Sequence, residues 1–305
     1  MIYKSKLVFH ADDLGLTKGF NEGIKIAYKK GVLNSTSIRT NGPFFEDAVK
    51  NIIPECSELS VGLHLNLVEG TSHLKKFNNY NKICNKEGIF KYKFIGLLIN
   101  SFNKKFLIQV ENELRSQFQI ANKKLNKIYH IDSHQHCCSI PKIFEITCKL
   151  AKEFNIKIVR IPDEKFFISG NFFSHFKSSY LINLIKWIVL KVCSYFNRIT
   201  AKKYDLNYPD SFVGILYTNS MNTKVCIDAI KNNNNFELVE ILLHPATYVG
   251  GLDEKYLSSE VRDYCLSPTR FIELQTLISN QLISFIKKNN ITITNFNKSI
   301  KKNLE

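Results

Sequence analysis

Strand-like and helix-like segments alternate along nearly the whole chain, and this alternation constrains the fold more than any other feature. Short apolar runs typical of buried strands are followed by segments whose apolar residues recur with helical spacing. Strands are expected at residues 5–10, 36–40, 59–66, 128–133, 157–161, 211–216, 236–243 and 291–294. Such an alternation predicts a mostly parallel sheet with helices packed against it.

The length of 305 residues fits one large α/β domain, and we expect residues 1–305 to form it. Strands in this number predict a closed or nearly closed (β/α) barrel related to the TIM barrel. A doubly wound open sheet, the main competitor, would need a Gly-rich phosphate loop after its first strand, where this chain has Asp12-Asp13-Leu14-Gly15. Residues 163–209 interrupt the alternation and are interpreted as a helical insertion between strands five and six.

Two other segments give specific expectations. Ser267-Pro268 predicts the start of one long helix that runs to about residue 288, because Ser is a favoured N-cap and Pro a favoured first helical residue. Residues 70–103, rich in Asn, Lys and Gly, are expected to be irregular. A connection of this length in a compact domain is often functional.

Polar residues of the kinds used in catalysis follow several predicted strands. A single Asp pair at a strand end is as consistent with a turn as with a ligand, and a lone His is more often structural. Agreement among strand ends is stronger evidence, because active sites of barrels lie at the carboxyl ends of the strands. These residues are Asp12 and Asp13, His64, the run from His130 to His136, Arg160, and His244.

The chain resembles the YdjC-like carbohydrate deacetylases, a group that contains chitooligosaccharide deacetylases and the hopanoid-associated deacetylase. The resemblance rests on motifs in the family's order: His10-Ala-Asp-Asp-Leu-Gly15, Val61-Gly-Leu-His-Leu-Asn66, His130-Ile-Asp-Ser-His-Gln-His136, Val159-Arg-Ile-Pro162, Pro209-Asp-Ser-Phe-Val-Gly214, Glu240-Ile-Leu-Leu-His-Pro-Ala246, and Arg270 with Glu273. His10 stands where the family usually has Asn, and the spacing after His244 differs from the family's. The resemblance implies a hydrolase that removes the N-acetyl group from an N-acetylated sugar, either an oligosaccharide or a glycolipid.

Amide hydrolysis needs an activated water, a stabilised oxyanion and a protonated leaving group. Asp13, His64 and His134 fit a facial metal-binding set of one carboxylate and two imidazoles, and the resemblance implies the same three positions. Asp12 beside them fits a general base, which Arg160 would hold ionised. His244 would protonate the departing amine.

Further residues of the same motifs are expected around this set. Glu240, Asp132 and His136 are candidates for fixing imidazole tautomers, and His130 and Asp132 fit a purely structural role equally well. The family resemblance implies Mg²⁺ as the metal. Two imidazole ligands make Zn²⁺ the physical competitor.

Two alternative functions remain at this stage. A metal-dependent phosphoesterase also uses Asp and His clusters on a barrel, although it normally needs ligands for two metals. A non-catalytic sugar-binding protein is the alternative from a different class, but such a module needs neither a base nor an acid.

The formal net charge is +15, yet the lysines are spread along the chain and no nucleic-acid-binding motif is present, so no nucleic-acid partner is expected. No signal-peptide pattern precedes the first strand and the eight cysteines form no CxxC pair. We therefore expect reduced thiols and a cytoplasmic protein.

The most apolar stretch lies within residues 171–204 and contains the single Trp of the chain, Trp187. One interpretation is a helix that packs on the barrel or forms a homodimer interface. The other is an amphipathic helix on the inner face of an anionic membrane, with lysines at the headgroups and Trp187 at the interface. The stretch is too short and too charged to predict a membrane span.

Overall fold

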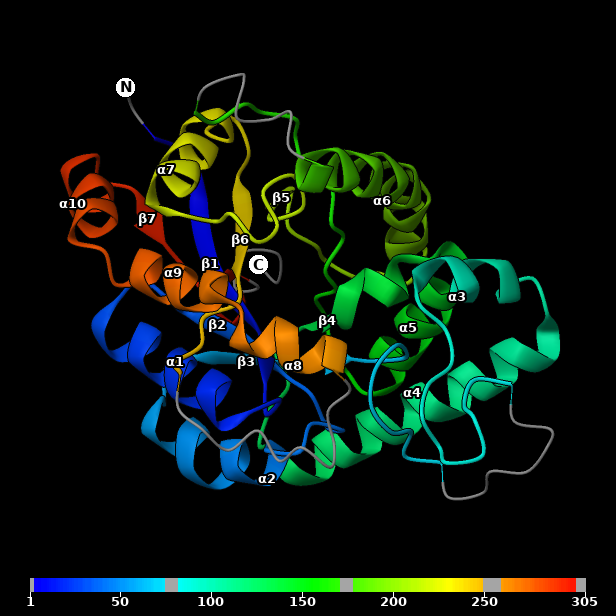
Figure 1. Ribbon diagram of the computed structural model, residues 1–305. Helices are drawn as coiled ribbons and strands as arrows, with labels where there is room; N and C mark the ends of the chain where they lie inside the picture. Colours follow the sequence, from blue (N-terminus) through cyan, green and yellow to red (C-terminus); the bar gives the residue numbers. More distant parts are fainter. Residues whose placement is uncertain (1–2, 75–81, 171–177, 249–258, 300–305) are drawn as a thin grey trace.

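The protein is represented by a computed structural model, which describes residues 3–74, 82–170, 178–248 and 259–299. Its centre is a parallel sheet in the order β4-β3-β2-β1-β6-β5, with β7 paired to the start of β1 (Figure 1). The strands are β1 (Lys6–Leu14), β2 (Ser35–Ile38), β3 (Ser60–Leu65), β4 (Ile131–Ser133), β5 (Ser211–Val213), β6 (Leu238–Leu243) and β7 (Thr292–Ile293). The predicted barrel-like α/β fold is confirmed.

The extended segment 158–164 connects the two edges of this sheet. Val159 forms a parallel bridge with Ile131 at the β4 edge, and Glu164 forms one with Phe212 of β5. The predicted fifth strand is therefore present only as isolated bridges. Pro162 lies in the middle of the segment, and because it has no N–H it cannot donate to a continuous ladder. The bridges close the curled sheet into an irregular barrel.

Helices surround the sheet (Figure 1). They are α1 (Lys18–Lys30), α2 (Phe45–Asp47), α3 (Phe94–Asn100), α4 (Lys104–Lys124), α5 (Pro141–Glu153), α6 (Ser178–Lys203), α7 (Thr223–Asn232), α8 (Ser259–Leu266), α9 (Pro268–Leu277), α10 (Asn280–Lys288) and α11 (Phe296–Ser299). A π-helical turn (Ala48–Ile52) and 3₁₀ turns (Ile53–Glu55 and His134–Ser139) complete the helical elements in the described part of the chain. No helix among the described residues is both long enough and apolar enough to cross a bilayer.

Two expectations about helices were wrong. The helix predicted from Ser267 to about residue 288 is divided into α9 and α10, because the Ser279 hydroxyl accepts a hydrogen bond from the Leu282 N–H and caps a new helix. The stretch 70–103, expected to be irregular, contains α3. The first error reflects a cap within the predicted helix, whereas α3 has no capping side chain at its start that would mark it in the sequence.

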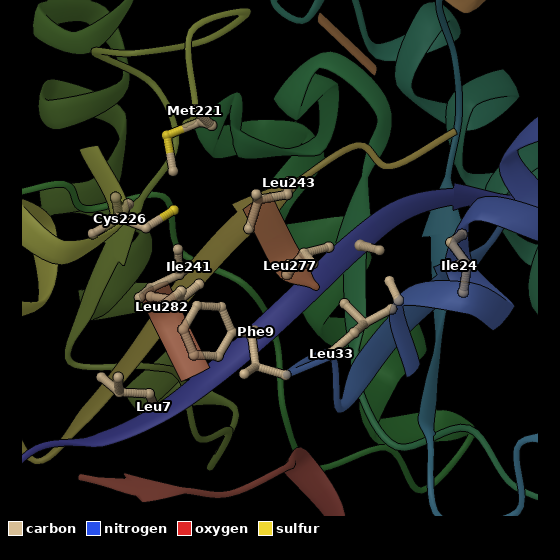
Figure 2. Packing of buried hydrophobic residues seen from close by; sticks show 14 of the residues in the cluster. Leu7, Phe9, Ile24, Leu33, Met221, Cys226, Ile241, Leu243, Leu277 and Leu282 are labelled. Atoms are coloured by element: carbon tan, nitrogen blue, oxygen red, sulfur yellow. The ribbon is translucent and has the colours of Figure 1, made fainter. Parts of the chain in front are cut away.

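The side chains of β1 alternate between the outside and the inside of the barrel. Leu7 and Phe9 face outward into the main core, whereas His10 and Asp12 make contacts inside the barrel. Figure 2 shows the outer cluster, in which Leu7, Phe9, Ile241 and Leu243 pack with Cys226, Leu277 and Leu282. At the other end of the interior, Val8, Ile158 and Phe296 form a small apolar cluster. The polar residues thus collect at the carboxyl end of the strands.

Strand β1 is longer than predicted and carries both aspartates within it. Its pairing with β2 shifts register between Ala11 and Leu14, and Asp13 has a left-handed φ of 69°. Successive side chains of a regular strand point to opposite faces, but this irregularity lets Asp12 and Asp13 both reach the interior, where each lies within 4 Å of His64. Gly15, with φ of 88°, then turns the chain away, as the sequence predicts.

Candidate metal centre

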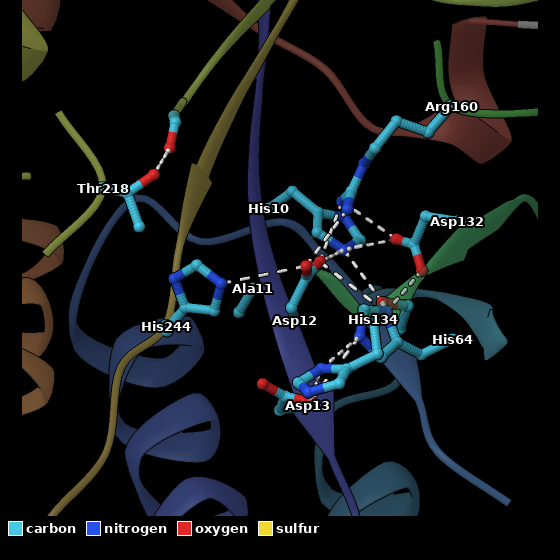
Figure 3. Close-up of polar contacts among 12 residues, drawn as sticks. His10, Ala11, Asp12, Asp13, His64, Asp132, His134, Arg160, Thr218 and His244 are labelled. Atoms are coloured by element: carbon cyan, nitrogen blue, oxygen red, sulfur yellow. Dashed lines mark hydrogen bonds and ion pairs between the residues drawn. The ribbon is translucent and has the colours of Figure 1, made fainter. Parts of the chain in front are cut away.

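Three side chains from different strand ends converge at the mouth of the barrel. Asp13 comes from β1, His64 from β3, and His134 from the turn directly after β4 (Figure 3). Asp13 Oδ1 lies 3.1 Å from His134 Nδ1 and 3.5 Å from His64 Nε2, and the two imidazole nitrogens are 3.4 Å apart. All three side chains are buried. The structure brings together the three residues expected to bind a metal.

Each of the two imidazoles contacts a carboxylate through its outward nitrogen. His64 Nδ1 is 2.6 Å from Asp132 Oδ1, and His134 Nε2 is 2.9 Å from Glu69 Oε2. With these carboxylates accepting the N–H of each ring, His64 Nε2 and His134 Nδ1 converge with Asp13 Oδ1, where their lone pairs would bind a cation. A carboxylate behind each ligand histidine is the usual second layer of a protein metal site.

Asp13 is held on both sides. The hydroxyl of Tyr264 in α8 donates to Asp13 Oδ2 at 2.8 Å, and Arg39 Nη1, just after β2, donates to Oδ1 at 3.3 Å. The phenol thereby directs Oδ1 toward the imidazoles. Arg39 is itself buried, and its Nε has no hydrogen-bond partner among the residues that the structure describes.

Negative charge exceeds positive charge in this buried region. Burial alone would lower the pKa of His134, but the carboxylates of Asp13 and Glu69 outweigh it and raise that pKa to about 9. Burial opposes ionisation of Asp13, yet His134 and His64 hold its pKa well below the usual range. A proton on His134 therefore supplies positive charge to this site. A bound divalent cation would take the place of that proton and supply the positive charge itself. The donor set and the surplus of carboxylates both fit such a cation.

Asp12 belongs to a second, adjoining network centred on Arg160. The guanidinium binds Asp12 with both nitrogens, at 3.1 and 2.9 Å, and Glu240 Oε1 of β6 at 2.7 Å. Burial opposes ionisation of Asp12, but Arg160 lowers its pKa far below the ordinary value. Arg160 Nη2 is also 2.9 Å from Asp132 Oδ2, so it connects the base candidate to the carboxylate behind His64.

His244 lies on the opposite side of Asp12, just after β6. Its Nε2 is 3.8 Å from Asp12 Oδ2 (Figure 3). Its Nδ1 is 3.3 Å from Glu273 Oε2 in α9. The His244 backbone N–H also donates to Glu273, and Arg270 lies 3.3 Å from the other Glu273 oxygen. The His244 side chain is 15% exposed and that of Asp12 is 6% exposed, so His244 is the more accessible member of this pair.

The other histidines of these motifs take different positions. His10 contacts Asp12 at 3.2 Å and Asp132 at 3.1 Å and lies behind the base. His130 packs at 4.3 Å on the ring of Phe296, and its Nε2 lies 3.7 Å from Asp132 Oδ2. Among the described residues neither of its nitrogens has a hydrogen-bond partner. His136 packs edge-on against Phe212. Neither His130 nor His136 contacts the three metal-ligand candidates through a recorded hydrogen bond or ion pair in the described residues.

Three contributors to the site were missed by the sequence analysis: Glu69, Arg39 and Tyr264. Arg39 directly follows β2, and Glu69 lies four residues beyond β3, so a wider search of residues after each strand would have found them. Tyr264 gave no comparable pattern, because α8 lies far from the strands in sequence. Glu273 was part of the Arg270 and Glu273 motif of the family resemblance, but no role was predicted for it.

The barrel fold and this arrangement of strand-end carboxylates and imidazoles occur in a chain whose sequence matches a known protein family. A family model described as YdjC-like protein matches residues 6–288, and the chain belongs to that family. Among its relatives, a carbohydrate deacetylase of Clostridium beijerinckii is 31% identical over 293 residues, which is 95% of this chain and 98% of the relative. Another from Thermoanaerobacter pseudethanolicus is 26% identical over 298 residues, covering 95% and 97%.

A solved structure supports the fold independently. A protein of Enterococcus faecalis V583, provisionally described as a cellobiose-phosphate cleavage protein, superposes with a TM-score of 0.70. It is 22% identical in sequence and the match covers 97% of this chain and 99% of that one. The family predicted from the motifs and the fold predicted from strand alternation are therefore both confirmed.

Proposed function

We propose that this chain is a metal-dependent carbohydrate deacetylase that hydrolyses the N-acetyl group of an N-acetylated sugar to acetate and a free amine. The observation that carries the proposal is the pairing of two features in one buried site. Two imidazoles, each backed by a carboxylate, face Asp13, and a separate acid–base pair, Asp12 and His244, adjoins them. The curated relatives named carbohydrate deacetylase supply the substrate class.

A divalent cation bound by Asp13, His64 and His134 would lower the pKa of a water and polarise the acetyl carbonyl. Asp12, kept ionised and oriented by Arg160, accepts the proton that the attacking water loses. His244 gives a proton to the nitrogen as the C–N bond breaks, so the amine leaves neutral. Glu273 positions the His244 ring through Nδ1. We propose Mg²⁺ from the family resemblance, with Zn²⁺ as the competitor that imidazole ligands favour.

The phosphoesterase alternative has less support from this geometry. A two-metal site would need a second cation among Asp12, Asp132 and Glu240. Arg160 already occupies that position. Its Nη2 lies 2.9 Å from an oxygen of Asp12, 2.9 Å from one of Asp132 and 2.7 Å from one of Glu240. The sugar-binding alternative leaves the Asp12–His244 pair without a purpose.

We propose a cytoplasmic site of action. All eight cysteines lie in described parts of the chain and are buried thiols that form no disulfide, including the neighbours Cys137 and Cys138 with sulfurs 3.9 Å apart. Free thiols in this number are typical of a reducing compartment.

The test is release of acetate from a panel of N-acetylhexosamine oligosaccharides and glycolipids. The wild type is measured as purified, after treatment with a chelator, and after metal is added back. We expect activity that chelation removes and metal restores, and its absence in Asp12→Asn. Substrate binding without acetate release in the metal-loaded wild type would favour the sugar-binding alternative, and phosphate release from sugar phosphates would favour the phosphoesterase.

A further inference from the structure

The outward face of α6 is apolar over most of its length. Eight large apolar side chains on this helix are between 50% and 67% exposed. Apart from two adjacent pairs, they recur at intervals of three or four residues and so form one stripe: Leu181, Ile182, Ile185, Ile188, Val192, Tyr195, Phe196 and Ile199. A contiguous exposed stripe of this length is unusual on a soluble monomer and indicates an interaction surface.

The inward face of the same helix is more polar than the outward one. Asn183 is buried and donates to the carbonyls of Leu216 and Thr218, and Asn197 donates to Ser139. Trp187 also turns inward, because its indole N–H donates to the Glu164 carbonyl at 2.9 Å. The indole N–H of Trp187 is therefore satisfied within the protein, and a position of this side chain at a membrane interface stays a prediction. The helix docks on the barrel through specific polar contacts and leaves its apolar stripe to solvent.

Helix α3 extends this surface. Ile95, Ile99 and Phe102, in and just after α3, are 61% to 71% exposed. Both α3 and α6 contact the turn His134–Ser139, and Phe94 and Trp187 pack against the same buried cluster around Leu190. Figure 1 shows the two helices on the same side of the barrel. We call these three residues, together with the α6 stripe, the α3–α6 surface.

The charges around this surface are predominantly positive. Residues 178–203 and 91–105 contain no Asp or Glu. They contain nine basic residues: Lys186, Lys191, Arg198, Lys202, Lys203, Lys91, Lys93, Lys104 and Lys105. The acidic partners recorded for them in the described residues are Asp163, Glu145 and Glu69. A second copy of the chain docked here would bring two positive faces together, whereas an anionic bilayer is complementary to both the apolar stripe and the charge.

We propose that the α3–α6 surface docks the protein on an anionic phospholipid bilayer. The apolar side chains enter the interface between headgroups and acyl chains, and the lysines contact the headgroups. The surface adjoins the metal centre, because Lys93 at the start of α3 lies 3.7 Å from Glu69, which binds His134. This placement favours an N-acetylated sugar carried on a lipid as the substrate, an inference that rests on the proposed deacetylase function.

The test is sedimentation of the full-length protein with vesicles of phosphatidylcholine alone and of phosphatidylcholine with phosphatidylglycerol. We expect binding to the anionic vesicles that weakens as salt is raised. Ile185→Asp combined with Val192→Asp should reduce the bound fraction at least tenfold, and Lys186→Glu at least fivefold. Ile272→Asp on α9 and Lys287→Glu on α10 are matched exposed controls and should bind like the wild type.

Three results would overturn the proposal. One is a protein that stays in the supernatant with both vesicle types. Another is binding that the α6 variants and the controls reduce equally. The third is a wild type that sediments as a dimer while the Ile185→Asp, Val192→Asp variant sediments as a monomer, with neither protein binding vesicles. A second copy of the chain, and not a bilayer, would then cover the surface. Vesicle binding is measured without substrate, so its result does not depend on whether the protein is a deacetylase. The α6 variants should retain activity on a soluble substrate, because the changed residues lie outside the proposed site.

Discussion

Replacing Glu69 by Gln tests whether the carboxylates behind the imidazoles belong to a metal site. Glu69 accepts from His134 Nε2 at 2.9 Å, and this contact leaves Nδ1 as the lone-pair donor. Gln has nearly the same size but no charge, so the variant weakens the orientation of the ring with little change in packing. Loss of such a partner typically costs ~10–100-fold in metal affinity, or ~1.4–2.8 kcal/mol.

A second effect acts in the opposite direction. The pKa of His134 is raised to about 9, so at pH 7 a proton competes with the metal and weakens binding by about a hundredfold. Glu69 is one of the two carboxylates that raise this pKa, and Gln at position 69 would lower it. Part of the lost affinity is then recovered at pH 7 but not at pH 9.5, where His134 is already deprotonated. We therefore expect a larger loss of affinity at pH 9.5 than at pH 7.

Isothermal titration of chelator-treated protein with Mg²⁺ or Mn²⁺ at the two pH values measures both effects. Glu87→Gln, an exposed change in the same region of the chain, is the matched control, and a thermal melt confirms that the variant is folded. Unchanged affinity in folded Glu69→Gln at pH 9.5 would refute the assigned role. A larger loss at pH 7 than at pH 9.5 would refute the proton competition.

Three further changes probe separate parts of the structure. Asp12→Asn should keep the metal and lose ~10²–10⁴-fold in turnover, because the amide cannot accept a proton; near-normal acetate release would move the base elsewhere. His244→Ala should lower kcat on the natural amide more than on a substrate with an activated leaving group, and equal losses on both would exclude the acid role. Gly62→Ala should destabilise the fold by ~1–3 kcal/mol in chemical denaturation, because a Cβ there would lie 2.4 Å from the His130 ring; unchanged stability would show that this ring is free to move.

The proposed ligands could be predicted because they lie at, or directly after, the carboxyl ends of strongly apolar strands. Parallel strands align their carboxyl ends, and the curling of the sheet brings Asp13 of β1 to His64 of β3 and His134 after β4, although β2 lies between β1 and β3. The supporting residues obey no such rule. Glu69 and Tyr264 reach the site from a loop and a helix whose positions depend on tertiary packing.

The departures in the fold have equally local causes. Strand β1 continues through Asp12 and Asp13 because both carboxylates bind buried partners, Arg160 and His134. Intrinsic strand propensity, which is low for Asp, does not take such contacts into account. The 158–164 segment pairs irregularly around Pro162. The outward apolar face of α6 was visible as an apolar stretch, but sequence periodicity alone did not show which side would be buried.

The most direct measurement for the central claim is metal content by mass spectrometry of the wild type and of His64→Ala and His134→Ala. Each variant removes one of three proposed protein ligands without touching Asp12 or His244. The account predicts one equivalent of a divalent metal in the wild type and a large loss in both variants. Full occupancy in either variant, or two equivalents in the wild type, would contradict a single metal bound by Asp13, His64 and His134.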